Sequence, residues 1–550
     1  MQYRIISKEY TPKYGEKQKI IAILLVICFL ICFFLSAILR TPYQSEGFSM
    51  SDATYHVLLT MQAYDETPSS VHHWLPLQTY DGEFNKFINN GPSLLQDKFG
   101  NNYYVSFSPI GFYLPYFFCK LFHLPLNINS LYLFNCLLMF LSALLLGILI
   151  YLIFKDVVCG IFAASIYIFL PEVLYSQGIV YWHHSLSQVF LFSQAILFVL
   201  LFIERNNQRK IIKQLLLFVA FYAMSFLYPY SEWTGFISNI GFALGILIFD
   251  LCIENDKDKK NKRLSISLRA IGNIIGLAAT TLFSAVYYVW RFKAVATVKD
   301  ILDTMNSRMN ARSQSGIVKL IFGYIDSFMP LLIVIVVCLI ISIIFKESRK
   351  KIKNSLFSKK SWILFLVFSF PLMENLLLKE HALTYTFDRL KCVLVLVFIL
   401  FGLLSAIKEK KYVIYQSVKI FVLITISLYG IVTYGNGKII DLVEYNDSIL
   451  LRDYLLDNYV GHGKNIIVKE GLRAWGYLQT MYHRNIYCTY IYTETQLKYE
   501  ALSSGSDYIV YVESTSGKND TLCYTKAKIF DLQTENEIYL SVNNHQVVVE

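Results

Sequence analysis

The chain has 550 residues, of which 55% are hydrophobic and only 16% are charged. An average soluble domain has about a quarter charged residues. This composition excludes a disordered chain, a soluble nucleic-acid-binding protein and a small disulfide-rich scaffold. Apolar runs long enough to cross a bilayer recur along the sequence, and the net charge is +10. The sequence therefore predicts a polytopic α-helical membrane protein whose Lys and Arg residues gather in cytoplasmic loops.

A basic tail, residues 1–19, precedes the first apolar run, residues 20–39. The run has no small-residue cleavage site, so we expect a retained helix and a cytoplasmic tail. About eleven spans are predicted, at residues 20–39, 128–154, 157–175, 185–203, 214–230, 234–252, 270–290, 328–345, 362–378, 392–407 and 412–434. They form a transmembrane module over residues 20–434, and their odd number places the C-terminus outside the cell.

The distribution of cations in the loops tests this orientation independently. Lys and Arg number 4, 6, 7 and 3 in the predicted inner loops at residues 204–213, 254–269, 346–360 and 408–411. The outer turns near 176–184 and 231–233 have none. This alternation follows the positive-inside rule. Two outer segments, 291–316 and 379–391, depart from the rule because each carries several cations.

Two parts of the chain are predicted to lie outside the membrane on its outer side. The first is a long loop, residues 41–108, followed by an aromatic, proline-bounded stretch over 109–118 that is typical of an interfacial helix. The second is residues 435–550, where strand-like runs alternate with helix-like stretches and predict a small α/β domain. This segment has no G-x-G-x-x-G fingerprint and no P-loop, so nucleotide binding there is unsupported. A disulfide between Cys488 and Cys523 is possible but does not follow from the sequence.

An acidic residue stands at the start of a helix-like segment in the first outer loop. The segment begins Asp52-Ala53-Thr54-Tyr55. One interpretation is a helix N-cap, in which Asp52 accepts hydrogen bonds from free backbone N–H groups. A carboxylate at a membrane surface can also act as a base. The residues alone leave both interpretations open.

This arrangement resembles the GT-C class of integral-membrane glycosyltransferases, which includes protein O-mannosyltransferases and the bacterial aminoarabinose transferase. In that class the first span leads to an outer loop with an acidic motif of the form Asp-x-x-Tyr, matched here by Asp52 and Tyr55. An aromatic, proline-containing stretch follows, matched here by residues 108–113, and an outer soluble domain often ends the chain. The resemblance implies a sugar donor carried on a polyprenyl phosphate or pyrophosphate. It also implies that Asp52 deprotonates or orients the acceptor and that Tyr55 contacts substrate.

The resemblance gives the cationic outer segments a role as well. Arg308, Arg312 and Arg389 would hold the lipid phosphate, because a guanidinium donates bidentately to phosphate oxygens. The residues alone also allow local ion pairs with nearby aspartates, namely Asp300, Asp303 and Asp388. His381, in the same loop as Arg389, is expected to donate to a phosphate oxygen or to carry a proton, or else to belong to a hydrated polar turn.

Further candidates lie at the outer ends of two other spans. His183 and His184 stand where many relatives have an acidic residue. Together with Asp52 they could bind a divalent cation, although an interfacial aromatic belt explains them equally. Glu232 is a carboxylate at the membrane edge, which is a functional candidate by default, although a helix-cap position is a second interpretation.

These features together predict a glycosyltransferase with Asp52 and Glu232 as its catalytic carboxylates. It would move a sugar from a polyprenyl-phosphate lipid to a glycolipid, polysaccharide or protein acceptor on the outer face of the cytoplasmic membrane. Two alternatives remain open. One is a transporter or flippase of lipid-linked sugars, which predicts repeated halves and ionisable residues at the midplane. The other is a polysaccharide polymerase or ligase, which shares the lipid substrate.

Overall fold

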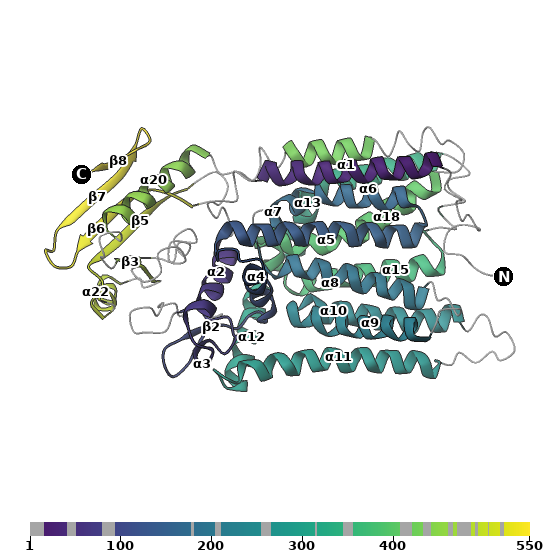
Figure 1. The fold of residues 1–550 in the computed structure, drawn as a ribbon, viewed down its shortest axis with the longest axis horizontal. Coiled ribbons are helices and arrows are strands. Elements are labelled where there is room, and N and C mark those ends of the chain that lie inside the picture. Colours follow the sequence, from purple (N-terminus) through teal and green to yellow (C-terminus); the bar gives the residue numbers. More distant parts are fainter. Residues whose placement is uncertain are drawn as a thin grey trace.

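A computed structural model shows a long helical bundle with a β-sheet beyond one of its ends (Figure 1). The structure describes residues 16–40, 51–79, 94–177, 181–203, 211–254, 266–313, 316–344, 352, 356–407, 421–432, 442–459, 466–469, 486–489, 493–503, 505–516 and 522–550. Helix α1 (Glu16–Arg40) begins at the end of the bundle opposite to the sheet. The beginning of α1 and the C-terminal sheet therefore lie at opposite ends of the bundle.

Seven helical segments among the described residues are long and apolar enough to cross a membrane. They are Ile128–Phe154, His183–Ile203, Ile211–Ser231, Thr234–Ile253, Leu268–Phe292, Ile317–Ile344 and Lys359–Leu377. Helices also lie at the other predicted positions, in α1, α6 (Val157–Ile168), α18 (Cys392–Ile407) and residues 421–432. The chain is thus a polytopic helical membrane protein, and its total of about eleven crossings stays a prediction.

The long segments correspond to α5 (Ile128–Phe154), α8 (His183–Phe198), α9 (Ile211–Ser231), α10 (Thr234–Phe249), α11 (Leu268–Phe292), α13 (Ile317–Ile344) and α15 (Lys359–Ser369). Short π-helical turns extend α8 and α10, at Val199–Ile203 and Asp250–Glu254. A 3-10 turn at Phe370–Leu372 and the helix α16 (Met373–Leu377) continue α15.

Two predicted spans differ from the observed helices for local reasons. Helix α13 begins at Ile317, eleven residues before the predicted start at 328, because the charged Lys319 and Asp326 interrupt the apolar run without interrupting the helix. The backbone leaves helical geometry at Phe328, two residues before Pro330, whose ring disfavours a regular helix there. The predicted span 157–175 is also divided, since α6 ends at Ile168 and α7 (Pro171–Ser176) starts anew at a proline.

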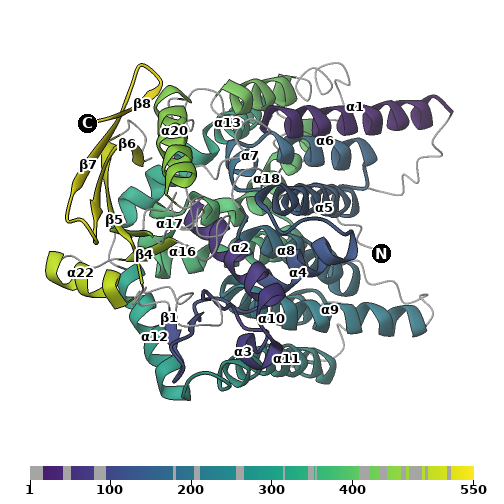
Figure 2. The same ribbon diagram turned by 60° about the vertical axis from the view of Figure 1, so that its left-hand side comes forward.

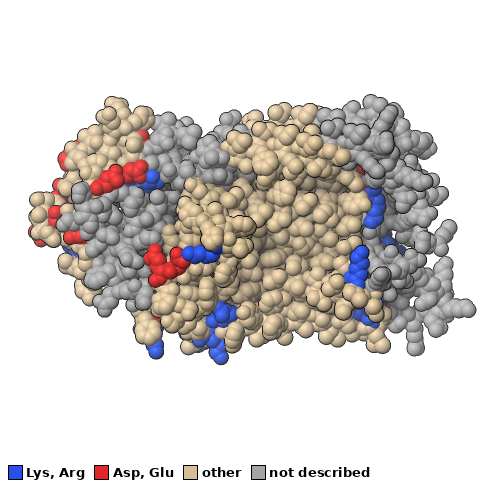
Figure 3. All heavy atoms as spheres, in the orientation of Figure 1, with Lys and Arg blue, Asp and Glu red and all other residues tan. Residues whose placement is uncertain are grey.

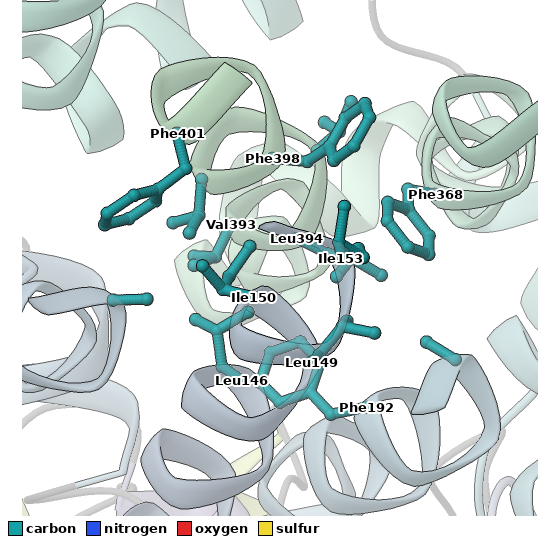
Figure 4. Packing of buried hydrophobic residues seen from close by; sticks show 14 of the residues in the cluster. Leu146, Leu149, Ile150, Ile153, Phe192, Phe368, Val393, Leu394, Phe398 and Phe401 are labelled. Atoms are coloured by element: carbon teal, nitrogen blue, oxygen red, sulfur yellow. The ribbon is translucent and has the colours of Figure 1, made fainter. Parts of the chain in front are cut away.

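The centre of the bundle is a cluster of buried aliphatic and aromatic side chains around α5. Helix α5 packs against α6, α8 and α18. The residues drawn in Figure 4 fill the space between α5, α8, α15 and α18, and they are Leu146, Leu149, Ile150, Ile153, Phe192, Phe368, Val393, Leu394, Phe398 and Phe401. Because lipid is as apolar as these side chains, close packing rather than the hydrophobic effect holds membrane helices together.

Two glycines allow α5 and α6 to approach closely. A Cβ atom on Gly147 would lie 2.8 Å from the carbonyl oxygen of Gly160, and one on Gly160 would lie 2.7 Å from that of Gly147. Small residues at a crossing are the usual device for close contact between membrane helices. On the face shown in Figure 3, the middle of the bundle is free of charged side chains, and Lys, Arg, Asp and Glu appear towards its ends.

The described residues between α1 and α5 fold over one end of the bundle. They contain α2 (Ser51–Glu66), α3 (Ser69–His72), an antiparallel pair of short strands, β1 (Leu94–Gln96) and β2 (Asn102–Tyr104), and α4 (Ile110–Leu121). The predicted aromatic stretch at 109–118 lies within α4 and its N-cap. Helix α12 (Val298–Arg312) follows α11 and precedes α13 in the chain, and it lies at the same end of the bundle (Figure 2).

The C-terminal segment forms a mixed six-stranded sheet in the order β4-β3-β5-β6-β7-β8. Strand β3 is parallel to β4 and β5, and the remaining pairs are antiparallel. The strands are β3 (Ile466–Lys469), β4 (Ile486–Thr489), β5 (Tyr508–Ser516), β6 (Leu522–Asp531), β7 (Glu537–Asn543) and β8 (Gln546–Val549). Helix α20 (Leu442–Asn458) packs on β6, β7 and β8, and α22 (Glu494–Ser503) packs on β3 and β5. The predicted domain boundary at residue 435 lies outside the described residues.

This strand order bears on the two cysteines of the segment. Cys488 is in β4 and Cys523 is in β6, with β3 and β5 between them. The backbones of the two cysteines thus belong to strands that are not neighbours in the sheet.

Candidate active site

Loops from several helices converge at the end of the bundle that faces the sheet (Figure 2). They are the first turn of α2, the start of α8, the link between α9 and α10, the last turn of α12, and the loop between α16 and α18. That last loop contains α17 (Lys379–Thr384) and a 3-10 turn, η6 (Thr386–Lys391). Helix α17 packs against α12 and α13, and η6 packs against α7 and α8. The loop between α16 and α18 therefore contacts α7, α8, α12 and α13.

Arg389 fixes the shape of this loop. Its Nε donates to the carbonyl oxygen of Ala382 at 2.8 Å, and its Nη2 donates to that of Leu383 at 3.1 Å. Its Nη1 donates to the carbonyl oxygen of Gly323 and to Ser327 Oγ, both at 2.8 Å. Because these bonds use most of the guanidinium N–H groups, they favour a structural role over the predicted phosphate contact.

His381 and Asp388 form a buried pair within the loop. His381 Nδ1 is hydrogen-bonded to Asp388 Oδ2. Burial alone would raise the pKa of the Asp388 carboxyl, but His381 and Lys391 hold that pKa below its usual value. Burial lowers the pKa of His381, against the opposing effect of Asp388. The pair is therefore a carboxylate and a neutral imidazole that donates its Nδ1 proton.

A second buried ion pair joins the end of η6 to the neighbouring helices. Lys391 Nζ bonds to Glu374 Oε2 and donates to Thr234 Oγ1 at 2.9 Å, and the Thr234 hydroxyl donates to Glu374. The carboxyl of Glu232, in the link between α9 and α10, is buried close to this group. Burial raises the pKa of Glu232 to about 8, although the charge of Lys391 opposes the shift. At neutral pH Glu232 is thus mostly protonated.

Ser327 connects Arg389 to a further carboxylate. Its hydroxyl accepts from Arg389 and donates to Glu172 Oε1 at 2.8 Å. Next to it, His184 Nε2 donates to the carbonyl oxygen of Ser176 at 2.6 Å, and the His184 ring stacks on Phe387 with 4.2 Å between centroids. This bond places the proton of a neutral His184 on Nε2, so its Nδ1 carries a lone pair.

His183 faces a different environment from His184. Its ring lies between Phe107 and Phe112, with centroids 4.7 and 5.1 Å away, and its Nε2 bonds to the carbonyl oxygen of Ser108 at 3.1 Å. Gly111 packs directly on this ring and leaves no room for a side chain. The two histidines therefore do not point into one site. Within the described part of the chain, no three His, Cys, Asp or Glu side chains are placed to hold a metal ion.

Asp52 and Tyr55 lie in the first turns of α2, and their side chains are outside the described residues. Thr54, between them, is buried, and its hydroxyl accepts a hydrogen bond from the backbone N–H of Tyr181 at 3.3 Å. This bond holds the first turn of α2 beside the start of α8, which carries His184. The backbone thus places the predicted Asp52 at the converging loops.

Arg308 and Arg312 lie one helical turn apart at the end of α12, so both side chains are on one face of that helix. Both are half-buried. Burial and the neighbouring Arg308 lower the pKa of Arg312, while Asp388 and Tyr385 in the loop oppose the shift. Asp300 does not pair with either arginine, since it forms a capping box with Thr297 at the other end of α12.

No hydrogen bond or ion pair to the Arg312 or Arg308 guanidinium occurs within the described chain, and Arg308 Nε is buried without a partner there. Burying two like charges without a hydrogen-bonded partner is unfavourable, because the charge of Asp388 offsets only part of the desolvation and repulsion. An anion between the two guanidinium groups would offset both effects. The end of α12 thus has the charge and the open hydrogen-bonding capacity of an anion site.

Sequence reasoning missed the pair of Lys391 with Glu374 and the bridging hydroxyls of Thr234 and Ser327. A signal for Glu374 was present, since a carboxylate inside an apolar run is costly without a partner. The partner was not readable, because Lys391 lies in the next loop. The hydroxyls carried no signal in the sequence.

Comparison with known proteins places this geometry in a structural class. No family model matches the sequence, and no curated protein matches it. ArnT from Cupriavidus metallidurans, solved bound to undecaprenyl phosphate, superposes with a TM-score of 0.55 at 8% identity, over 97% of this chain and 98% of that one. The oligosaccharyltransferase AglB from Archaeoglobus fulgidus, solved with an inhibitory peptide and a dolichol-phosphate, gives 0.52 at 11% identity, over 88% and 69%.

The chain has the GT-C fold. Another structure of the Archaeoglobus fulgidus oligosaccharyltransferase, in its apo form, gives a TM-score of 0.52 at 10% identity, over 92% of this chain and 70% of that one. The predicted GT-C architecture is therefore confirmed as a fold. Which branch of the class the chain belongs to stays a prediction.

Proposed function

We propose that the protein transfers a sugar from a polyprenyl-phosphate lipid to a cell-envelope acceptor, at the end of the bundle that faces the sheet. The observation that carries the proposal is the half-buried pair Arg308 and Arg312, which lies beside buried carboxylates and a histidine in a GT-C fold. An arginine pair suits a phosphate because the planar guanidinium donates two parallel hydrogen bonds.

The arginine pair acts on the leaving group. As the bond from the sugar C1 to the phosphate oxygen breaks, its electron pair passes to the phosphate, whose charge grows. Arg308 and Arg312 stabilise this charge where it develops, which is the largest contribution in many enzymes. Phosphate is a good leaving group, so the site needs no strong general acid at that oxygen.

The carboxylates act on the acceptor side. By resemblance, Asp52 holds or deprotonates the acceptor hydroxyl or amine. Glu232, mostly protonated at neutral pH, donates a hydrogen bond to a sugar hydroxyl. The positive-inside rule supports placing this site on the outer face of the cytoplasmic membrane. A divalent cation is not needed by these roles, and metal dependence is read from the assay by adding a chelator.

The test is donor consumption by the purified chain in a panel of polyprenyl-phosphate sugars, followed by mass spectrometry with candidate glycolipid acceptors. The unsubstituted chain is expected to consume one donor and to release polyprenyl phosphate. Asp52→Asn is expected to be slower by a factor of about 10² to 10⁴, the usual contribution of a positioned acid or base. Asp65→Asn is a matched control at the other end of α2, where Asp65 forms an exposed pair with Lys120. Full activity of Asp52→Asn would remove the catalytic assignment and leave Glu232 as the next candidate.

A further inference from the structure

The roles proposed above leave the buried pair of His381 and Asp388 without a function. Both side chains are buried, with 6% and 3% of their surfaces exposed. The hydrogen bond joins His381 Nδ1 to a carboxylate, which only accepts, so the imidazole proton is on Nδ1. Nε2 of the neutral ring then carries a lone pair. No described residue donates a hydrogen bond to this nitrogen.

Contacts from Asn375 and Tyr385 hold this pair in place. The Asp388 main chain is held by Asn375, whose Nδ2 donates to the Asp388 carbonyl oxygen at 3.1 Å and to Tyr324 Oη at 2.6 Å. The Tyr385 ring packs on the His381 ring with 4.7 Å between centroids. A carboxylate that orients an imidazole and stabilises its protonated form is the arrangement that makes histidine an effective base in enzymes.

The charges around His381 come from each element packed on its helix. Asp388 lies in η6, Glu374 in α16 and Arg312 at the end of α12, and all three act on the His381 charge. From α13, Tyr324 is linked to the pair through its hydrogen bond to Asn375. Helix α12, which ends at Arg312, packs on α17, which carries His381. The proposed phosphate position is therefore next to the helix that carries the imidazole.

We propose that His381 Nε2 is the base that takes the acceptor proton during transfer, and that Asp388 is its positioning residue. The inference rests on the proposed function. The acceptor oxygen forms a bond to the sugar C1, its proton moves to Nε2, and the bond from C1 to the phosphate oxygen breaks with its electron pair on the phosphate. The imidazolium then returns the proton to solvent or to the released phosphate.

This assignment changes the role of Asp52 from removing the proton to holding the hydroxyl. Asp52 lies in the first turn of α2, and a carboxylate can hold an acceptor hydroxyl by accepting its hydrogen bond. The base at His381 is strengthened by the donor. A phosphate bound to Arg312 adds negative charge near the imidazole and favours its protonated form.

The experiment compares His381→Gln with the unsubstituted chain in donor turnover and in undecaprenyl phosphate binding. Gln can still donate to Asp388 but cannot take a proton. We expect binding within twofold of the unsubstituted chain and turnover lower by a factor of about 10² to 10⁴. The acidic limb of the pH profile of turnover should disappear. His123→Gln is the control, because His123 is exposed between α4 and α5. Equal loss of binding and turnover would make His381 a phosphate ligand and overturn the assignment.

Two further measurements separate a chemical role from a structural one. In Asp388→Asn the acidic limb should move to lower pH, because a charge that favours the imidazolium is gone. In His381→Ala, added imidazole should restore part of the turnover, whereas lost packing would not respond. If neither variant folds, a flat pH profile of the unsubstituted chain refutes the inference. Absence of turnover in the unsubstituted chain refutes the proposed function itself, whereas full turnover in His381→Gln refutes the role of His381 alone.

Discussion

Removing Lys391 should strongly destabilise the protein, because its partner lies in a site that water does not reach. The side chains of Lys391 and Glu374 are 4% and 8% exposed. Glu232 and Asp388 lie near the same ammonium group, and both raise its pKa together with Glu374 although burial opposes this. Lys391→Met therefore leaves several carboxyl groups without their shared cation. Breaking a buried pair from one side costs about 3–5 kcal/mol.

The magnitude is measured by unfolding in mixed micelles of dodecyl maltoside and sodium dodecyl sulfate, followed by tryptophan fluorescence. Lys120→Met is the matched control, because Lys120 and Asp65 are each 44% exposed and such surface pairs contribute about 1 kcal/mol or less. The double variant Lys391→Met with Glu374→Gln should recover most of the loss, since removing both charges leaves no unpaired ion. A loss in Lys391→Met no larger than in Lys120→Met would refute this reasoning.

Three further predictions concern other parts of the molecule. Glu232 binds its proton more tightly in the folded state, so its contribution to stability should fall by about 1.4 kcal/mol per pH unit between about pH 4.5 and 8. Glu232→Gln should abolish this slope of the unfolding free energy against pH. An unchanged slope would contradict the assignment. Gly160→Leu should cost about 1–3 kcal/mol or more through overpacking against α5, whereas Gly272→Leu, where a Cβ meets open space, should cost much less in the same micelle titration. Arg308→Gln with Arg312→Gln should weaken undecaprenyl phosphate binding by a factor of about 10² or more, since each charged hydrogen bond is worth about 1.5–3 kcal/mol; unchanged affinity in native mass spectrometry would place the phosphate elsewhere.

The helices were predictable because a bilayer imposes length and composition on each span. The same rule misplaced the start of one helix, because it assumes that a helix ends where its apolar run ends. Helix α13 starts before its apolar run, at Ile317, because a helix outside the hydrocarbon layer tolerates Lys319 and Asp326. The strand order of the C-terminal sheet was not predictable, since pairing between β3, β4 and β5 joins segments far apart in the sequence.

The sequence predicted which residues could belong to the candidate site better than it predicted which of them contact one another. Ionisable residues at the membrane edge are functional candidates, so Glu232, Arg312 and His381 were identifiable one by one. Their relations depend on how the loops fold together. Arg389 illustrates this, because its predicted phosphate contact and its observed bonds to Ala382 and Leu383 use the same N–H groups. His183 likewise packs among aromatic rings although its neighbour His184 reaches the site.

The most direct test of the central claim follows the fate of the sugar on a lipid donor. Liposomes containing the protein are loaded with a polyprenyl-phosphate sugar and a glycolipid acceptor, and both lipids are quantified by mass spectrometry over time. We predict that sugar leaves the donor and that polyprenyl phosphate appears in equal amount. Arg308→Gln with Arg312→Gln should slow the loss of donor and the release of polyprenyl phosphate. Lys299→Gln, at an exposed position at the start of α12, should slow neither. Movement of intact donor between leaflets with no polyprenyl phosphate released would contradict the account and favour a flippase.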